Sequence, residues 1–119
     1  MKYALLVYTD QSDWQALSDE ESARMRAESM PKWNALFAEI GKADPNVISR
    51  ELASASEAKV VRVVDGKTVV TDGPFAETKE VLGGFFITEL GDLDEAIRLA
   101  ALVPAAEYGT LEIRPLVAR

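Results

Sequence analysis

The chain has 119 residues and a net charge of −7 at pH 7, and it contains neither cysteine nor histidine. The missing cysteine excludes disulfides, a thiolate nucleophile and cysteine-bound zinc. The missing histidine removes the commonest general base and metal ligand near neutral pH. The acidic charge argues against nucleic acid and anionic membranes as partners, because clustered lysine and arginine bind both. A domain of this length buries roughly two thirds of its unfolded surface, so we expect a core without cross-links.

The chain opens with a short apolar run, Met1–Tyr8, that contains one lysine. This run is too short for a signal-peptide core with a cleavage site, and far shorter than the roughly 20 residues of a membrane-spanning helix. Its side chains are apolar at both alternating sets of positions, which is typical of a strand in the middle of a sheet. We therefore interpret residues 3–9 as the first strand of a cytoplasmic protein.

A helix is predicted from Ser18 to Gly41, after a polar connection over residues 10–17. Ser18 can cap it, and Glu21 stands three residues later, as in a capping box. Pro31 interrupts the pattern, so the helix either kinks there or breaks and restarts with the proline in its first turn. Its expected buried stripe is Ala23, Ala27, Met30, Trp33, Phe37 and Ile40.

The second half of the chain reads as strands around one further helix. Asp65-Gly66 between two β-rich runs is a strong hairpin signal. Asp92 can cap the second helix, which Pro104 ends. The predicted strands are 47–52, 59–64, 67–71, 83–90 and 111–117.

This order is βαββαβ with one extra hairpin, which indicates an α+β, ferredoxin-like fold. Both helices should then cover one face of an antiparallel sheet and leave the other face bare. The strands are nevertheless apolar on both faces, and an exposed apolar face of this extent marks an interface. We expect a homodimer through the open sheet face. The paired positions that carry this pattern are Leu5 and Leu6, Val63 and Val64, and Phe85 and Phe86.

The stretch Thr71–Glu80 reads TDGPFAETKE and is followed by LGGFF at Leu82–Phe86. With Met1–Tyr8, Val61–Lys67 and Glu112–Pro115, it resembles the DGPF branch of the YCII-related family over most of the chain. The resemblance implies one domain over residues 1–119 and a dimeric α+β barrel, with a cleft for a small organic molecule between the sheet and the helices of each protomer.

The resemblance has one departure. Some YCII-related proteins carry a histidine on the first helix and an aspartate before a proline at the end of the second, proposed as a catalytic dyad. This chain has no histidine, and Val103 precedes Pro104. The proposed dyad is therefore missing at both positions, and a catalytic activity that depends on it is not expected of this chain.

Asp72 and Glu77 are the candidate catalytic residues, because without histidine acid–base chemistry depends on Asp, Glu, Lys or Tyr. Aspartate before Gly73-Pro74 commonly hydrogen-bonds the backbone two residues on and fixes a turn, and we favour that interpretation. Phe75 is expected to anchor the loop in the core. Gly73 is expected to supply an unusual backbone angle. The charged run from Glu77 is either a solvated face or part of a site.

If the charged run is part of a site, Thr78 and Lys79 reach an anionic group of the ligand, while Glu77 or Glu80 acts as a base; a solvated face is the default interpretation. Gly83-Gly84 either admits close approach of a ligand or backbone, or forms a bulge, which we favour. In one interpretation, Arg62 and Arg114 together bind a carboxylate of the ligand as a clamp. In the other, Arg114 pairs with Glu112 or Glu89 on the surface. Tyr8 lines a pocket mouth or belongs to the core. The candidate ligand-binding residues are Tyr8, Arg62, Thr78, Lys79, Gly83 and Gly84.

No cofactor is indicated, and a metal would need an all-oxygen site, for which no acidic loop has the required spacing. Three functions stay open. The first is a small dimeric enzyme that acts on an organic molecule, and the second is a non-catalytic binder that uses the same cleft. The third is an interaction or regulatory module linked to transcription control, which the resemblance suggests because family members are often encoded near alternative sigma factors.

Overall fold

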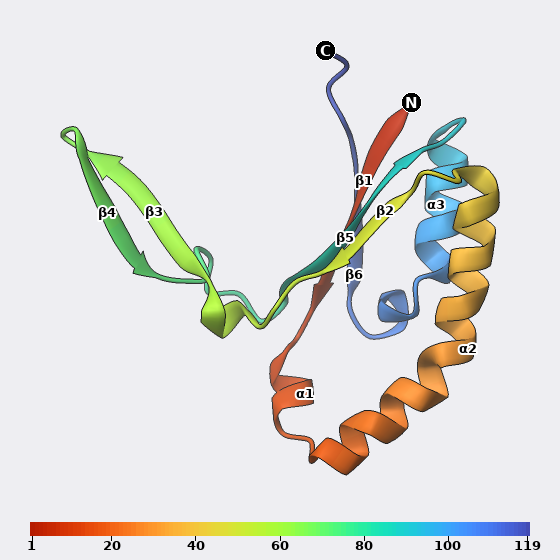
Figure 1. Cartoon of the computed structure of the whole chain (residues 1–119), viewed down its shortest axis with the longest axis horizontal. Coiled ribbons are helices and arrows are strands. Elements are labelled where there is room, and N and C mark those ends of the chain that lie inside the picture. The colour runs from red at the N-terminus through yellow and green to blue at the C-terminus, as the bar shows by residue number, and fades with distance from the viewer.

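A computed structural model describes residues 1–119 and shows a four-stranded sheet with two long helices on one side and a separate hairpin on the other (Figure 1). In chain order, the elements are β1 (Lys2–Thr9), α1 (Ser12–Gln15), α2 (Asp19–Ala43), β2 (Ile48–Glu51), the 3₁₀ turn η1 (Ala55–Glu57), β3 (Lys59–Val64), β4 (Lys67–Asp72), β5 (Val81–Glu89), α3 (Leu93–Leu102), the 3₁₀ turn η2 (Pro104–Glu107) and β6 (Thr110–Pro115).

The main sheet has the strand order β2-β5-β1-β6, and every neighbouring pair is antiparallel. Without the β3–β4 hairpin, the chain follows the βαββαβ order with the first and third strands in the centre, as in ferredoxin-like folds. Helices α2 and α3 lie on the same side of the sheet (Figure 1). The predicted α+β, ferredoxin-like fold is confirmed.

The core fills the space between the sheet and these two helices. On β1, Tyr3, Leu5 and Val7 point into it, and they alternate with half-buried residues that face the open side. Leu36 of α2 and Leu99 of α3 are fully buried against them. The other members of the core cluster are Ile40, Phe86, Leu90, Ala96, Val103 and Ala105.

Helix α2 begins at the predicted capping box, in which the Ser18 hydroxyl accepts a hydrogen bond from the Glu21 backbone N–H at 3.1 Å. The helix is continuous through Pro31 and changes direction along its length (Figure 1), so the alternative of a break and restart is wrong. Gly41 does not end it, because the helix continues to Ala43.

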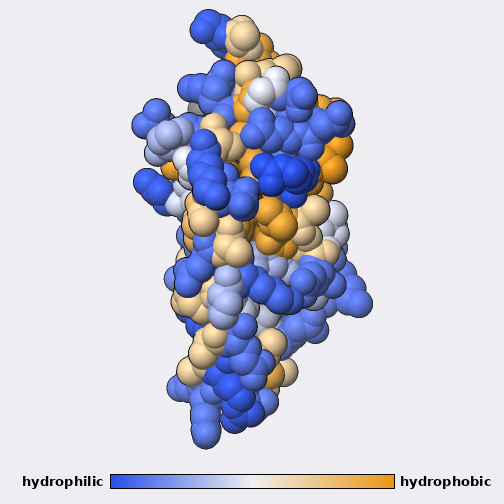
Figure 2. Space-filling model, turned by 90° about the vertical axis from the view of Figure 1, so that its right-hand side faces the viewer, coloured by the Kyte–Doolittle hydropathy of each residue, from blue (hydrophilic) through white to orange (hydrophobic).

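The buried stripe of α2 is shorter than predicted. Leu36 and Ile40 are its buried residues, while Met30 and Phe37 are 50% and 44% exposed. No residue of its first half is buried, because that half extends beyond the layer that the sheet covers (Figure 1). Figure 2 shows the side of the molecule on the right of Figure 1, where the helices lie. Hydrophilic residues cover most of it, with hydrophobic residues between them.

The short helix α1 lies in the segment that the sequence pattern assigned to a polar connection. Its Trp14 packs edge-to-face against Tyr108, with 5.4 Å between the ring centroids. Burial raises the pKa of the Tyr108 hydroxyl, with a smaller contribution from the neighbouring Glu107 carboxylate. No helix of the structure combines the length and the apolar character needed to span a membrane.

A buried carboxylate ties the end of α2 to the end of β5. Asp44 accepts hydrogen bonds from the backbone N–H of Glu89 at 2.9 Å, from the Asn46 backbone N–H at 2.9 Å and from the Thr88 hydroxyl at 3.2 Å. The bond from Glu89 is the main reason that the pKa of this carboxyl lies below its ordinary value. Asp44 therefore acts as a structural link beside the core.

Candidate functional site

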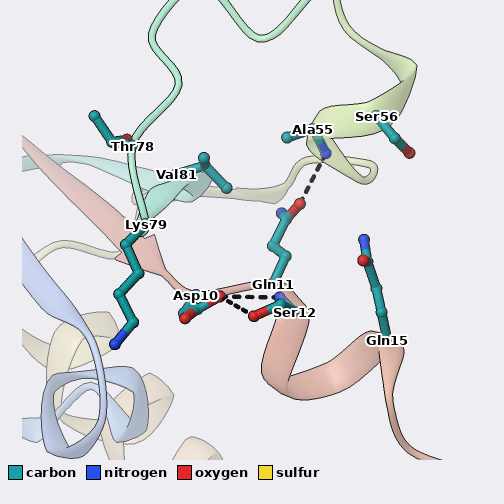
Figure 3. A pocket seen from close by; sticks show the side chains of 9 residues that line it. All are labelled: Asp10, Gln11, Ser12, Gln15, Ala55, Ser56, Thr78, Lys79 and Val81. Carbon is teal, nitrogen blue, oxygen red and sulfur yellow. Dashed lines mark hydrogen bonds between the residues drawn. The ribbon is translucent and has the colours of Figure 1, made fainter.

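Two depressions meet where the β3–β4 hairpin leaves the rest of the molecule. The first has a volume of about 480 Å³, and only two of its nine lining residues are hydrophobic. It is formed by the end of β1 with α1, by η1, and by the loop before β5 (Figure 3). Its lining residues are Asp10, Gln11, Ser12, Gln15, Ala55, Ser56, Thr78, Lys79 and Val81.

Asp10 is held in a fixed position within this polar depression. Its Oδ1 accepts a hydrogen bond from the Ser12 hydroxyl at 2.5 Å and another from the Ser12 backbone N–H at 3.0 Å. The hydroxyl bond is the main cause of the lowered pKa of Asp10, and the positive charge of Lys79 adds to the effect. Asp10 is therefore an ionised carboxylate at neutral pH.

Gln11 connects two walls of the depression. Its Oε1 accepts a hydrogen bond from the Ala55 backbone N–H at 2.8 Å, which ties the start of α1 to η1. Figure 3 shows the Gln15 side chain extending toward Ser56 on the same side. The amide groups of Gln11 and Gln15 thus give this wall neutral donors and acceptors.

Lys79 contributes the cation of the depression. Its ammonium group has no carboxylate within the 4.0 Å of an ion pair, although it is close enough to Asp10 to lower that group's pKa. The neighbouring Thr78 hydroxyl donates to the Glu80 carbonyl at 2.5 Å, so its oxygen still has a free lone pair. Thr78 and Lys79 therefore line the same depression.

The second depression is apolar, has a volume of about 550 Å³ and lies at the base of the hairpin. It shares Ala55 and Val81 with the first. Its remaining lining residues are Leu52, Ala53, Ser54, Glu57, Ala58, Lys59, Val60, Pro74, Phe75 and Leu82.

Asp72 and Glu77 line neither depression. Asp72 ends β4, where it pairs with Lys59 on the neighbouring strand, and its side chain is 84% exposed. The turn that follows is held instead by the Gly73 backbone N–H, which donates to the Ala58 carbonyl at 2.8 Å. The interpretation of Asp72 as the residue that fixes this turn is therefore wrong. Glu77 is exposed and forms no ion pair.

Tyr8 lies on the open face of the sheet, where its hydroxyl donates to Glu112 at 3.3 Å. Arg114 also pairs with Glu112, which is the surface pairing named as the alternative to a clamp. Arg62 is on the separate hairpin sheet, 5.3 Å above the centre of the Phe75 ring. The two arginines therefore do not form a clamp within one chain. Phe75 is 75% exposed, so its expected role as a core anchor is wrong.

The glycines near the site either form a bulge in the strand pairing or allow a neighbouring segment to approach closely. Gly83 is the extra residue of a bulge, because Val7 pairs with Gly84 and the next residue of β1 pairs with Leu82. A Cβ on Gly84 would lie 3.0 Å from the Arg50 carbonyl oxygen, so this glycine allows close approach of the neighbouring strand. At Gly73 the φ angle is not positive, contrary to the expectation. A Cβ there would meet the Ala58 side chain at 2.9 Å.

The lining residues that the sequence pattern did not single out are Asp10, Gln11, Ser12, Gln15, Ala55, Ser56 and Val81. The only local signal among them is an aspartate at the end of a strand with a serine two residues later, which favours a side-chain-to-backbone turn. That signal predicts a turn and carries no information about the segments 55–56 and 78–81, which complete the depression.

Comparison with known proteins identifies the family of this chain. The family model for the YCII-related domain matches residues 1–118. An uncharacterized protein of Rhizobium meliloti (strain 1021) is 39% identical over 118 residues, which covers 98% of this chain and 92% of that protein. This chain therefore belongs to the YCII-related family.

Proposed function

We propose that the protein is a homodimer that binds a small organic anion in the polar depression. The observation that carries this proposal is the Lys79 ammonium group, which has no ion-pair partner and shares a depression with neutral hydrogen-bonding groups. In a chain with a net charge of −7, a cation without a carboxylate partner is a favourable place for an anionic group.

Neutral groups around Lys79 would orient the bound ligand. The amides of Gln11 and Gln15 and the hydroxyls of Ser56 and Thr78 can bond a ligand carboxylate or hydroxyl from different sides. An exposed ion pair alone contributes only about 0–1 kcal/mol, so these neutral contacts must provide most of the affinity. Because the depression is open, we expect dissociation constants from about 1 μM to 1 mM, or about 8 to 4 kcal/mol of binding free energy.

The geometry favours binding over proton transfer. Asp10 is the carboxylate of the depression, and its pKa lies below the ordinary value because Ser12 donates to it. A general base works best when its pKa lies near the operating pH, and a lowered value moves Asp10 away from that range. Asp10 then orients the Ser12 hydroxyl and repels ligands with a second negative charge on that side.

The open face of the sheet supports the dimer. Leu6 faces outward opposite Phe85, and Ile48 faces outward opposite Ile87, with no element of the same chain covering them (Figure 1). These side chains form an apolar stripe across three strands, and sheets pack face to face through such surfaces at a distance of about 10 Å. Two copies packed in this way would form the α+β barrel that the family resemblance implies.

The anion site is tested by titrating small carboxylates, phosphates and sulfonates into the protein and following binding by calorimetry. Lys79→Met should weaken the best ligand about three- to fivefold, which corresponds to about 0.7–1 kcal/mol. Lys42→Met is the matched control, because Lys42 is an exposed lysine on α2 that lies outside both depressions. Equal affinity for the wild type and Lys79→Met would overturn the proposal.

A further inference from the structure

We infer that the β3–β4 hairpin is an arm that crosses to a second copy of this chain and packs one valine face against it. This inference rests on the proposed homodimer and adds a second contact to it. The docking face consists of Val61, Val63 and Val70.

One face of the arm has no packing partner within its own chain. Val61, Val63 and Val70 are 62%, 70% and 58% exposed. Val61 stands directly opposite Val70, and Val63 is two residues further along the same face, so the three side chains are contiguous. A two-stranded hairpin alone in water is marginally stable at best, and three exposed valines on one face need a cover.

The opposite face of the arm is already partly covered. Arg62 and Val69 are cross-strand partners on that face, and the Arg62 side chain lies over the Phe75 ring. Val69 is 41% exposed, less than any valine of the docking face. The free apolar surface of the arm is therefore concentrated on Val61, Val63 and Val70.

The whole chain exposes more surface than a compact monomer. Its accessible surface is 8327 Å², whereas a monomer of 13.0 kDa exposes about 6300 Å². Its radius of gyration is 16.5 Å, compared with about 13.5 Å for a compact domain of this length. The excess of about 2000 Å² is in the range that each copy buries in an obligate homodimer, where both copies together bury about 2000–5000 Å².

The direction of the arm fits a two-fold arrangement. Figure 1 shows the arm and the sheet diverging from a common base, with the helices on the far side of the sheet. A second copy placed between the arm and the open sheet face would contact both. By two-fold symmetry its own arm would then hold the first copy, as an isologous interface requires.

Charge also favours a second copy as the occupant. Residues 59–72 contain Lys59, Arg62 and Lys67 against Asp65 and Asp72, a net charge of +1. The whole chain has a net charge of −7, so the remainder has −8. Docking the arm on the partner brings a segment with a net positive charge onto an acidic body and offsets the repulsion between two acidic copies.

The test compares Val61→Asp/Val70→Asp with Val64→Asp in sedimentation equilibrium. Val64 is on the opposite face of the same arm and is 50% exposed, so this control makes the same kind of substitution in the same hairpin. Two of the three valines of the docking face are replaced by a charged residue, so the double variant should raise the dimer dissociation constant at least about 100-fold. The control should change it by less than about fivefold.

Hydrogen exchange on the wild type gives a second readout that does not depend on variants. Amides of residues 59–72 should be protected at concentrations where the dimer forms and should exchange freely on dilution. A dimer whose arm is unprotected, or a double variant that dimerises like the wild type, would overturn the arm and leave the sheet-face dimer intact. Equal weakening by Val64→Asp would overturn the choice of face. A wild type that stays monomeric would overturn both proposals.

Discussion

Removing the Asp44 carboxylate should destabilise the protein more than any surface change, because this group holds two secondary-structure ends together. In Asp44→Ala, the Thr88 hydroxyl and the Glu89 backbone N–H lose the same oxygen, Oδ2, as acceptor. Thr88 is 1% exposed, so water does not replace the bond there. At about 1.5–3 kcal/mol for each hydrogen bond to a charged group, we expect a loss of about 3–5 kcal/mol.

Asp44→Asn separates the hydrogen bonds from the charge. Its amide oxygen can occupy the Oδ2 position and keep both buried donors, while its NH₂ group faces the Asn46 N–H, which belongs to an exposed residue and can turn to water. We expect a loss of about 1–2 kcal/mol for this variant. Urea denaturation at pH 7 measures both losses, and an unchanged slope shows that both variants unfold from the same compact state.

The contribution of the Asp44 charge to the stability of the fold depends on pH. The folded-state pKa of Asp44 is below its ordinary value of 3.8. Its charge therefore stabilises the fold above that value, and the contribution disappears as the pH falls through the folded pKa. The stability gap between the wild type and Asp44→Asn should stay constant above about pH 5 and narrow below about pH 4. A loss below about 1 kcal/mol in Asp44→Ala, or a gap that does not narrow in acid, would refute this reasoning.

Three further predictions concern single positions. Gly84→Ala should destabilise by about 1–3 kcal/mol, because the new Cβ meets the Arg50 carbonyl at 3.0 Å. Gly41→Ala should instead stabilise by about 0.5–1 kcal/mol, because the added Cβ on α2 meets nothing within 4 Å and alanine favours the helix. Thermal unfolding should show a lower melting temperature for Gly84→Ala and a higher one for Gly41→Ala. A lower melting temperature in both variants would contradict the conclusion that there is room for a Cβ at Gly41. Asp72→Asn should change stability by less than about 1 kcal/mol and leave anion binding intact, since its pair with Lys59 is exposed.

Short-range signals in the sequence predicted the local structure well. Asp65-Gly66 predicts a two-residue turn, and both residues have positive φ values, 51° and 76°. Ser18 and Glu21 predict the start of α2, and both capping hydrogen bonds are present. These features depend on backbone geometry within a few residues, so no knowledge of the tertiary structure is needed.

Features that depend on neighbours distant in the sequence were predicted less well. The helical stripe omitted Leu36, which is fully buried, and included Phe37, which contacts Phe86 of the sheet yet stays 44% exposed, because the helix orientation is set by α3 and the core. Phe75 was expected in the core because it is aromatic, but the hairpin carries it away from the sheet. The polar depression combines residues 10–15, 55–56 and 78–81, and only Thr78 and Lys79 of these were identified in advance.

We propose that two copies of this chain form the functional unit. Native mass spectrometry of gently purified protein distinguishes a dimer from a monomer. We predict a dimer of about 26 kDa, twice the 13.0 kDa chain, because the exposed surface exceeds that of a compact monomer by about 2000 Å². A single species at 13.0 kDa across the micromolar range would contradict the claim.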